Sequence, residues 1–454
     1  MEPEKRSSIE MQDKPEEGSP ISLGDRYGLG AGLGAQLPEE GADVAVAGAS
    51  RTGWLTKLGL WVKEKGLSAW YFPAIALVLV LVGNVRFYDE FNPNYFSIDY
   101  LIVPVAFQAL CVVSMVYMWR IATTEKIYRF KLLIWGATVL CLGYVWYMGA
   151  PSGSYDFALG SIYVEASNMA FPAVLALALL LGGLRKRLVG YMVAAALCFA
   201  LLVVLLAWQV PSRMVLVVAY VMAVMVAQAF LERFFPRISS SARLVIALVA
   251  SLAVVAIMLF DMFPWYGTAT SVQSFLTTGK SDPFNSGWEY LQVDKLLAGS
   301  RLIGSSDTLM YHNYYALTPR GWWWSFPILN TIVVSGRLLG LAIGLLCVCL
   351  VALLVRAVLK STPRNRPIVT ALAGMIAVQM TATVLMNFNL FPISNLGMPF
   401  FGQGTFTLLL NCLALGVIAG LRREELEAEA QPVQPAEAAP APCSQWAEES
   451  LGIQ

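Results

Sequence analysis

The segment from residue 264 to residue 326 holds four carboxylates and two arginines, the side chains needed for acid–base chemistry on a phosphorylated substrate. A positioned carboxylate can act as a general base, and a guanidinium can bind phosphate oxygens through two parallel hydrogen bonds. Asp307 is the best candidate base, because the Gly-Ser-Ser sequence before it is small and leaves room for a bulky ligand. Arg301 and Arg320 are the candidates for binding a diphosphate.

The same segment has plainer interpretations. An Asp after small residues also suits a turn or the N-cap of a helix, so Asp307 has a structural alternative. His312, the only histidine of the chain, could act as a base, but a single histidine in a loop is more often incidental. The other three acids of the segment are Asp282, Glu289 and Asp294.

The composition identifies the environment in which this segment must be held. Of the 454 residues, 57% are hydrophobic and 13% are charged, whereas a soluble domain carries about 25% charged residues. The chain is therefore predicted to be an all-α polytopic membrane protein. The basic residues stand in short clusters between apolar runs, which argues against a nucleic-acid partner, and the seven cysteines show neither disulfide nor metal-site spacing.

Hydropathy predicts about ten transmembrane helices. They cover residues 70–88, 101–119, 132–149, 168–184, 188–207, 211–231, 243–263, 327–356, 367–391 and 402–421. The loops between them alternate in charge, because Lys and Arg follow every second span and are absent from loops such as 150–168 and 392–403. The positive-inside rule then places both termini in the cytoplasm. Residues 264–326 become a large outer loop between the seventh and eighth helices.

The two ends of the chain differ from its apolar centre. Residues 1–53 and 424–454 are acidic and lack apolar stretches, which is typical of disordered tails. Residues 54–66 place Trp and Leu side chains on one helical face and Lys towards the other, which predicts an interfacial helix or a simple extension of the first span. The transmembrane domain is then expected to cover residues 67–423.

The most specific pattern lies at the end of the apolar region. Gln379 stands thirteen residues before Pro392, and a Pro399-Phe400 turn, Gly404 and an Asn411-x-Leu-Ala-Leu-Gly run follow. This order resembles the C-terminal signature of the SEDS family (shape, elongation, division and sporulation; FtsW/RodA-type proteins). Ten spans with a large outer loop between the seventh and eighth also match the topology of that family.

A second match opens the outer loop. Asp282-Pro283, Gly287 and Gln292 fall on positions where family members have Asp-Pro, Gly and Gln, and Gly336-x-Leu-Leu-Gly340 resembles the start of the family's eighth span. The resemblance implies that Asp282, Gln292, Gln379 and Asn411, together with Arg301 and Arg320, contribute to substrate binding. Arg320 aligns with an arginine of the family motif.

One departure bears on catalysis. SEDS polymerases carry an essential Asp late in this loop, but the corresponding stretch here is Arg320-Gly-Trp-Trp-Trp-Ser-Phe326, and no Asp or Glu occurs between Asp307 and Glu424. Glycosyl transfer from an undecaprenyl diphosphate donor requires a base for the acceptor hydroxyl and cationic or metal stabilisation of the leaving group. Asp307 would have to replace the missing acid. A divalent metal, Mg²⁺ or Mn²⁺, is possible, although no sequence motif supports one.

Two hypotheses stay open within the resemblance. The chain is either a peptidoglycan glycosyltransferase that polymerises lipid II, or a non-catalytic SEDS-derived protein that binds a lipid-linked precursor or docks a transpeptidase. A lipid transporter is disfavoured, because the spans show no paired broken helices. Whether the chain is an enzyme is therefore undecided by the sequence. The resemblance further implies a class B penicillin-binding protein as partner and the bacterial cytoplasmic membrane as location, in cell elongation, division or shape.

Overall fold

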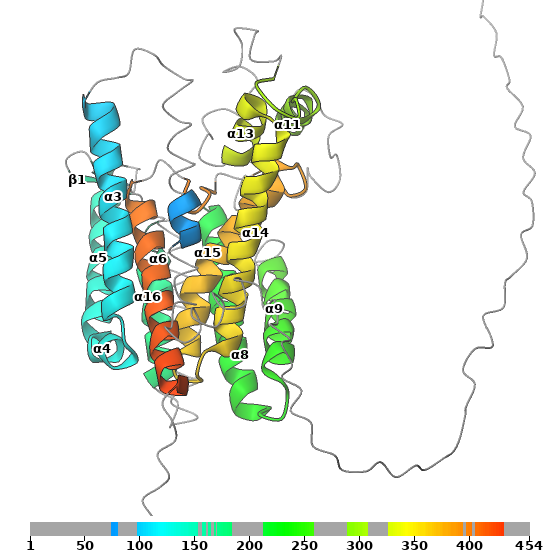
Figure 1. Ribbon diagram of the computed structural model, residues 1–454. Helices are drawn as coiled ribbons and strands as arrows, with labels where there is room; N and C mark the ends of the chain where they lie inside the picture. The colour runs from blue at the N-terminus through cyan, green and yellow to red at the C-terminus, as the bar shows by residue number, and fades with distance from the viewer. Residues whose placement is uncertain are drawn as a thin grey trace, which may run out of the picture. The chain divides into compact units, whose positions relative to one another are not determined.

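The computed structural model describes residues 74–79, 98–152, 157–159, 162–164, 168, 170–183, 212–257, 288–306, 326–393, 396–401 and 405–430. All of them belong to one compact unit, residues 54–454. The described part is built almost wholly of helices (Figure 1), in agreement with the predicted all-α class. One short antiparallel hairpin, β1 (Phe157–Leu159) and β2 (Ile162–Val164), is an addition that hydropathy did not predict.

Eleven labelled helices make up this part of the chain. They are α3 (Ile98–Ile121), α4 (Thr124–Arg129), α5 (Lys131–Ser152), α6 (Ala170–Gly183), α8 (Ser212–Phe234), α9 (Ser240–Ile257), α11 (Trp288–Ala298), α13 (Pro327–Ser335), α14 (Arg337–Lys360), α15 (Arg366–Asn387) and α16 (Thr405–Ala430). Seven of the predicted spans coincide with α3, α5, α6, α8, α9, α15 and α16, apart from their ends. The predicted span 188–207 lies outside the described residues, and of 70–88 only 74–79 are described, as helix.

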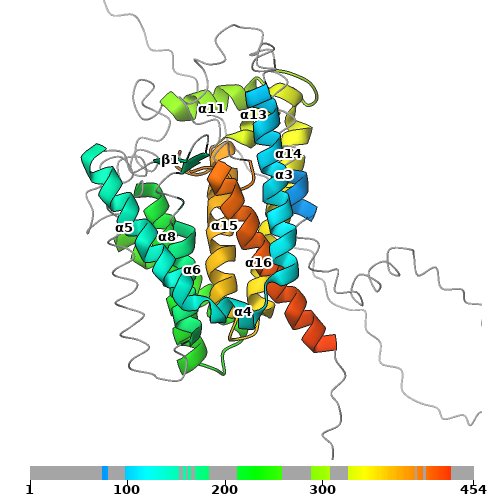
Figure 2. The ribbon, with the colours of Figure 1, turned by 90° about the vertical axis from the view of Figure 1, so that its left-hand side faces the viewer.

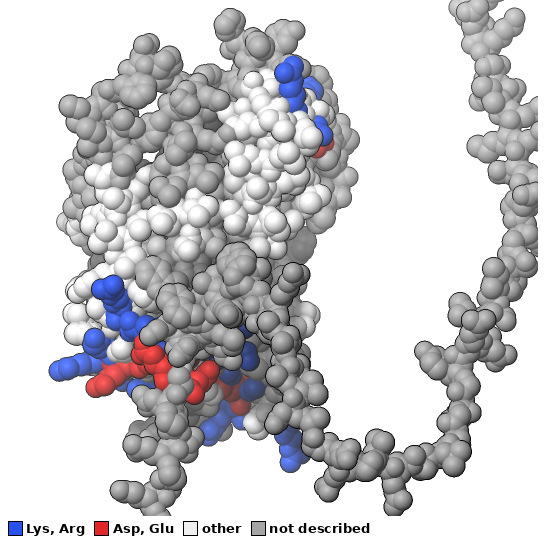
Figure 3. Space-filling view, viewed as in Figure 1, with Lys and Arg blue, Asp and Glu red and all other residues white. Residues whose placement is uncertain are grey.

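The helices are suited to a membrane. Four of those described are long and apolar enough to cross it, at Leu216–Phe234, Arg337–Lys360, Arg366–Asn387 and Phe406–Glu429. Figure 3 shows a broad uncharged surface, with Lys, Arg, Asp and Glu gathered mainly at one end of the molecule. An uncharged band of this kind matches the hydrocarbon layer, so the chain is a membrane-embedded polytopic protein.

The predicted eighth span, 327–356, is wrong in one respect: it is two helices. α13 ends at Ser335 and α14 begins at Arg337, with Gly336 between them at φ 102°. A Cβ atom on Gly336 would lie 2.6 Å from the carbonyl oxygen of Leu302. Only glycine tolerates both this positive φ and so close a backbone approach. The glycine at position 336 therefore allows the helix to break there. Hydropathy missed it because apolar residues stand on both sides.

The C-terminal boundary also differs from the prediction. α16 continues to Ala430, so residues 424–430, which we had assigned to a disordered tail, are helical. The extension has a clear cause. Glu424 and Glu425 are bound by neighbouring turns, and these contacts hold the last turns of the helix beyond the apolar region.

α15 is the central helix of the bundle, since it packs against α6, α8, α14 and α16 (Figures 1 and 2). The closest packing is between α3 and α16. Gly416 and Gly420 of α16 face α3, where an added Cβ would lie 2.5 Å from the carbonyl oxygen of Met115 and 2.9 Å from the Cβ of Ala122. Small residues four apart let two membrane helices approach to backbone contact.

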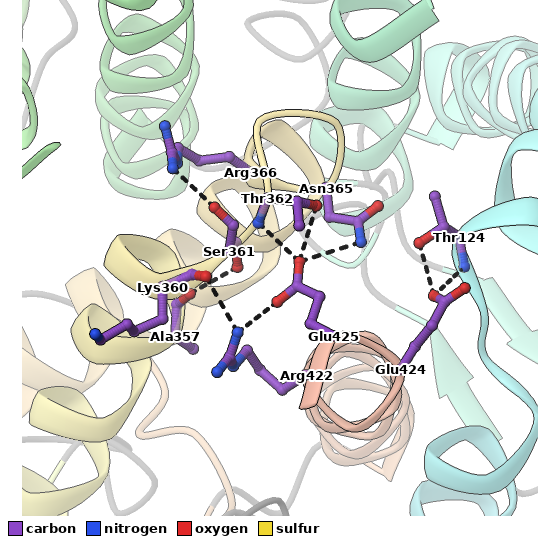
Figure 4. A network of polar contacts seen from close by, with 10 residues as sticks. All are labelled: Thr124, Ala357, Lys360, Ser361, Thr362, Asn365, Arg366, Arg422, Glu424 and Glu425. Carbon is purple, nitrogen blue, oxygen red and sulfur yellow. Dashed lines mark hydrogen bonds and ion pairs between the residues drawn. The ribbon is translucent and has the colours of Figure 1, made fainter. Parts of the chain in front are cut away.

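A polar network closes the charged end of the bundle (Figure 4). The Glu425 carboxylate accepts hydrogen bonds from the Thr362 backbone N–H at 2.8 Å and from the Asn365 side-chain amide at 3.3 Å, and it pairs with Arg422 at 2.5 Å. Its neighbour Glu424 accepts from both the backbone N–H and the hydroxyl of Thr124, at 2.7 and 2.6 Å. Adjacent carboxylates on α16 therefore join the α14–α15 turn to the start of α4.

Candidate functional site

The predicted site residues fall into three groups. Asp307, Arg320 and Asp282 lie outside the described residues. Gln292 and Arg301 belong to the part of the outer segment that the structure describes, on α11 and directly after it. The third group, Gln379 and Asn411, lies inside the helix bundle on α15 and α16.

An apolar cluster fixes α11 at the end of the bundle opposite the charged network. Tyr290, Val293 and Leu296, at helical spacing on α11, pack against Phe326, Leu329 and Val333 of the α13 region and against Met386 and Ile393. Burying one face of a short amphipathic helix is what holds it in place, because so short a helix is not stable alone. α11 therefore forms a lid-like layer over the start of α13 (Figure 2).

Polar contacts pin the same helix to the end of α15. The Asn389 side-chain amide donates to the Asp294 carboxylate at 2.7 Å and to the Tyr290 carbonyl oxygen at 3.2 Å. The Tyr290 hydroxyl in turn accepts from the Ile393 backbone N–H at 3.1 Å. Asn389 has φ 57°, a left-handed conformation that asparagine tolerates better than most residues.

The chain after α11 runs along the break between α13 and α14. The N–H groups of Gly304 and Ser306 donate to the carbonyl oxygens of Ser335 and Val333, at 3.0 and 2.7 Å. In the opposite sense, the N–H of Arg337 donates to the Arg301 carbonyl oxygen at 2.9 Å. A helix end leaves backbone carbonyl and N–H groups without intrahelical partners. Here the loop provides hydrogen-bond partners for the end of α13 and for the start of α14.

Arg337 adds side-chain contacts to this junction. Its Nε donates to the Ser300 hydroxyl at 2.8 Å, and one terminal nitrogen donates to the carbonyl oxygens of Leu297 and Ala298, at 2.9 and 3.2 Å. These carbonyls belong to the C-terminal turn of α11. A guanidinium at that position satisfies carbonyls that the helix cannot pair.

The consequence is that the chain is held firmly up to the residue before Asp307. Ser306 is buried, and its hydroxyl donates to the Gly299 carbonyl oxygen at 3.1 Å while its N–H is bonded to α13. The described part of this loop therefore ends at a constrained residue, Ser306.

Gln292 and Arg301 contribute differently. Gln292 is only 5% exposed, and its Oε1 has no hydrogen-bond partner among the described residues. Leaving a buried acceptor without a partner costs about 1–3 kcal/mol. The Gln292 Oε1 can therefore gain stability by accepting a hydrogen bond from a ligand. Arg301, in contrast, is an exposed residue shortly after the end of α11.

The bundle pair has a structural setting. The Gln379 amide donates to the Met375 carbonyl oxygen one turn earlier, at 3.0 Å. Asn411 is fully buried; its amide donates to the Thr407 carbonyl oxygen at 3.0 Å, and its Oδ1 has no partner in the described part of the chain. Polar groups at this depth are costly and are commonly functional. No hydrogen bond described joins them to Gln292 or Arg301.

Metal ligation is not provided by the described residues, which contain no group of three His, Cys, Asp or Glu side chains able to hold an ion. Asp294, the carboxylate described at this end, is already bound to the Asn389 amide.

Sequence reasoning missed the residues that build the junction. Arg337, Asn387 and Asn389 were not singled out, although the Asn387 Oδ1 accepts from the Leu329 N–H at 2.8 Å and so positions the start of α13. One signal was present. An Asn-x-Asn pair closing an apolar span is unusual, because such residues favour caps and turns over helix interiors.

Among comparisons with known proteins, only the comparison with solved structures finds matches, and these concern the fold. No family model matches the sequence, and no curated protein matches it. Solved structures do match the architecture. One match is a chain in a solved structure described as "Structural coordination of polymerization and crosslinking by a peptidoglycan synthase complex". It superposes with a TM-score of 0.56 and 20% sequence identity, and the match covers 78% of this chain and 97% of the other.

The rod shape determining protein RodA of Thermus thermophilus gives the same result, with a TM-score of 0.51, 18% identity and coverage of 78% of this chain and 96% of that one. A point mutant of that protein matches with a TM-score of 0.50 and 17% identity. Identities this low establish architecture alone. The chain therefore has the fold of the SEDS-type protein RodA, as its C-terminal and outer-loop motifs predicted.

Proposed function

We propose that this protein is a SEDS-like peptidoglycan polymerase that extends glycan strands from lipid II. The observation that carries the proposal is the junction between α11 and the α13–α14 break, which holds Ser306 immediately before Asp307. A RodA-like fold and a constrained loop that ends directly before Asp307 support the proposal of glycosyl transfer at that end of the bundle.

The proposed chemistry uses protein side chains. Asp307 would accept the proton of the acceptor 4-hydroxyl as that oxygen forms a bond to the anomeric carbon of the donor. The bond from this carbon to the diphosphate breaks, and its electron pair leaves with the undecaprenyl diphosphate. Arg301 and Arg320 would bind the leaving diphosphate through charge-assisted hydrogen bonds. Asp282 and Gln292 are proposed to bind the substrate, and Gln379 and Asn411 to shape the site from the bundle.

A second function is a non-catalytic SEDS-like protein that binds a lipid-linked precursor without turning it over. The specific observation in its favour is the run of residues between Asp307 and Glu424, which contains no carboxylate where the family has its essential Asp. Binding would use the same end of the bundle but needs no base. Both proposals therefore expect a lipid-linked precursor as ligand, and only the first expects it to be converted into glycan strands.

The partner proposed is a class B penicillin-binding protein. One matching chain comes from a complex described as coordinating polymerization and crosslinking. A crosslinking enzyme beside this chain would use the strands it makes. Photo-crosslinking in membranes should recover such a transpeptidase, and consistent failure to recover one would contradict the proposed complex.

The test of function uses purified full-length protein with its partner and labelled lipid II, with and without Mg²⁺ or Mn²⁺. Asp307→Asn preserves size but removes the base, so we expect at least about a hundredfold loss of glycan synthesis. Arg320→Ala should weaken use of the donor. Glu427→Gln is the matched control, because that exposed acid lies at the opposite end of the molecule and should leave the rate unchanged.

Each outcome separates the hypotheses. Wild-type activity that survives Asp307→Asn would exclude Asp307 as the base. Lipid II binding without turnover in the wild-type protein would support the non-catalytic function. Movement of a lipid across the bilayer without polymerisation would instead favour a transporter.

A further inference from the structure

The turn between α8 and α9 carries three arginines that have no acidic partner among the described residues. Arg233 ends α8, Arg237 lies in the turn, and Arg243 lies in the first turn of α9. The acid nearest to them in sequence, Glu232, points elsewhere: it pairs with Arg366 of α15 at 3.1 Å. Three positive charges within eleven residues therefore have no acidic partner among the residues that the structure describes.

Three other basic residues at this end of the molecule have side-chain partners within the chain. Arg422 pairs with Glu425, and Arg423 pairs with Glu427 at 3.5 Å. Arg364 lies over the Tyr128 ring, 4.9 Å from its centroid. The α8–α9 turn is thus distinguished from the network of Figure 4 by its lack of partners.

Two donors in the turn are also unsatisfied. The Nε of Arg243 and the hydroxyl oxygen of Ser240 are both buried from solvent, and neither has a hydrogen-bond partner among the described residues. The turn itself is well ordered by backbone bonds, from the Ile238 N–H to the Phe235 carbonyl oxygen at 3.1 Å and from the Arg243 N–H to the Ser239 carbonyl oxygen at 3.0 Å. The ordered backbone fixes the positions from which the exposed Arg233 and Arg237 side chains extend.

The surroundings of the turn are apolar and exposed. Phe234 and Phe235 are 44% and 48% exposed, and the rings of Phe230 and Phe234 are in contact at a tilt of 38°, with centroids 4.4 Å apart. The candidate membrane span of α8 ends at Phe234, so these rings lie at the depth where aromatic side chains favour the membrane interface.

α9 continues this apolar surface away from the turn. Val245, Val249 and Leu252 recur at helical spacing and are all more than half exposed. A stripe of exposed aliphatic side chains that leads away from a basic turn matches the shape of an amphiphile, with a charged group at one end and hydrocarbon along the helix.

We propose that the α8–α9 turn is a binding site for the headgroup of an anionic phospholipid. The phosphate would accept hydrogen bonds from the guanidinium groups of Arg233, Arg237 and Arg243. The acyl chains would lie along α9. The occupant is a membrane lipid and not free phosphate, because the exposed Phe and Val side chains next to the arginines need hydrocarbon as their partner.

The test compares the full-length protein with two triple variants in a neutral detergent. Arg233→Gln, Arg237→Gln and Arg243→Gln together remove the proposed site. The control combines Lys126→Gln and Arg129→Gln in α4 with Lys131→Gln at the start of α5. It removes the same charge from the same end of the molecule. Two acids lie near these residues, Glu125 in the sequence and Glu424 through its contact with Thr124. Native mass spectrometry counts bound phosphatidylglycerol against phosphatidylcholine, and thermal unfolding follows stabilisation.

We expect wild-type protein and the α4 control to retain one phosphatidylglycerol in preference to phosphatidylcholine. The α8–α9 variant should bind phosphatidylglycerol roughly a hundredfold more weakly, since each basic residue near a membrane surface contributes about 1 kcal/mol, a factor of about five. Arg237→Gln alone, in the exposed turn, should show part of the loss and serves if the triple variant unfolds.

Three results would overturn the proposal. Equal retention of both lipids by the wild-type protein would show no preference for charge. Equal loss in the two triple variants would show a general surface effect. Stabilisation by inorganic phosphate equal to that by phosphatidylglycerol would identify a simple anion site in place of a lipid site.

Discussion

Gly336 is the residue on which the contact between the 301–306 loop and the α13–α14 break most directly depends. It combines φ 102° with a position where an added Cβ would contact the Leu302 carbonyl oxygen and the Ile303 backbone. Gly336→Ala should destabilise the folded protein by roughly 1–3 kcal/mol through backbone strain alone, with more from the clash. Thermal unfolding in detergent measures this loss. In Gly344→Ala, also on α14, the new Cβ lies 3.8 Å from the nearest atom; a similar loss there would contradict the argument.

Arg337 is the second single residue that can be tested. Arg337→Lys keeps the charge, but an ammonium cannot reproduce the planar fork that reaches Ser300, Leu297 and Ala298. A lysine that keeps one or two of the three hydrogen bonds loses about 1–2 kcal/mol, so amide exchange in residues 299–306 should accelerate roughly tenfold. Hydrogen exchange followed by mass spectrometry reports it. Arg356→Lys, an exposed position nearer the other end of α14, is the matched control and should leave that segment's exchange unchanged.

At the residue scale, sequence patterns singled out candidates whose roles stay predictions. Asp307 and Arg301 stood out as a carboxylate and a guanidinium in an apolar chain, and Gln292 as a match to the family motif. The contacts of the described residues around them were not predicted. Arg337 binds carbonyls about forty positions earlier in the chain, at Leu297 and Ala298, and no local pattern signals a partner at that separation.

At the scale of elements, uninterrupted apolar runs predicted α3, α5, α15 and α16 well, because burial in hydrocarbon demands helix wherever the run is long enough. The same logic failed at the α13–α14 break. There the 301–306 loop replaces the missing intrahelical hydrogen bonds, and hydropathy does not record where a backbone group finds its partner. The turn that receives Glu425 was missed for the same reason.

That turn supports a prediction about how the elements are joined. Glu425 is nearly buried, and it links Arg422 of its own helix with Thr362 and Asn365 of the α14–α15 turn. Glu425→Gln would leave Arg422 unpaired, so we expect the stability of the bundle to fall by roughly 2–3 kcal/mol.

The measurement is the midpoint of thermal or denaturant unfolding of the purified protein. Glu427→Gln provides the control on the same helix, because Glu427 is 63% exposed in its contact with Arg423 and exposed ion pairs contribute little. If both variants lose equal stability, the link between α16 and the α14–α15 turn has no special role.

At the scale of the whole molecule, the charge distribution predicts orientation. Basic residues lie in the last turns of α3, α8 and α14 and, as Arg422 and Arg423, inside α16, at the end closed by the network of Figure 4. α11 and the junction with α13 lie at the other end (Figure 1). Because short basic loops are retained on the cytoplasmic side, we predict that both termini are cytoplasmic and that residues 264–326 face outward.

Cysteine labelling in intact cells tests this orientation. In a background without the seven native cysteines, a membrane-impermeant maleimide should label Ser286→Cys in the outer segment without permeabilisation. Pro363→Cys, in the exposed turn between α14 and α15, should be labelled only after the membrane is opened. The reverse pattern would place Asp307 on the cytoplasmic side, and an acid there could not serve the extension of glycan strands outside the cell.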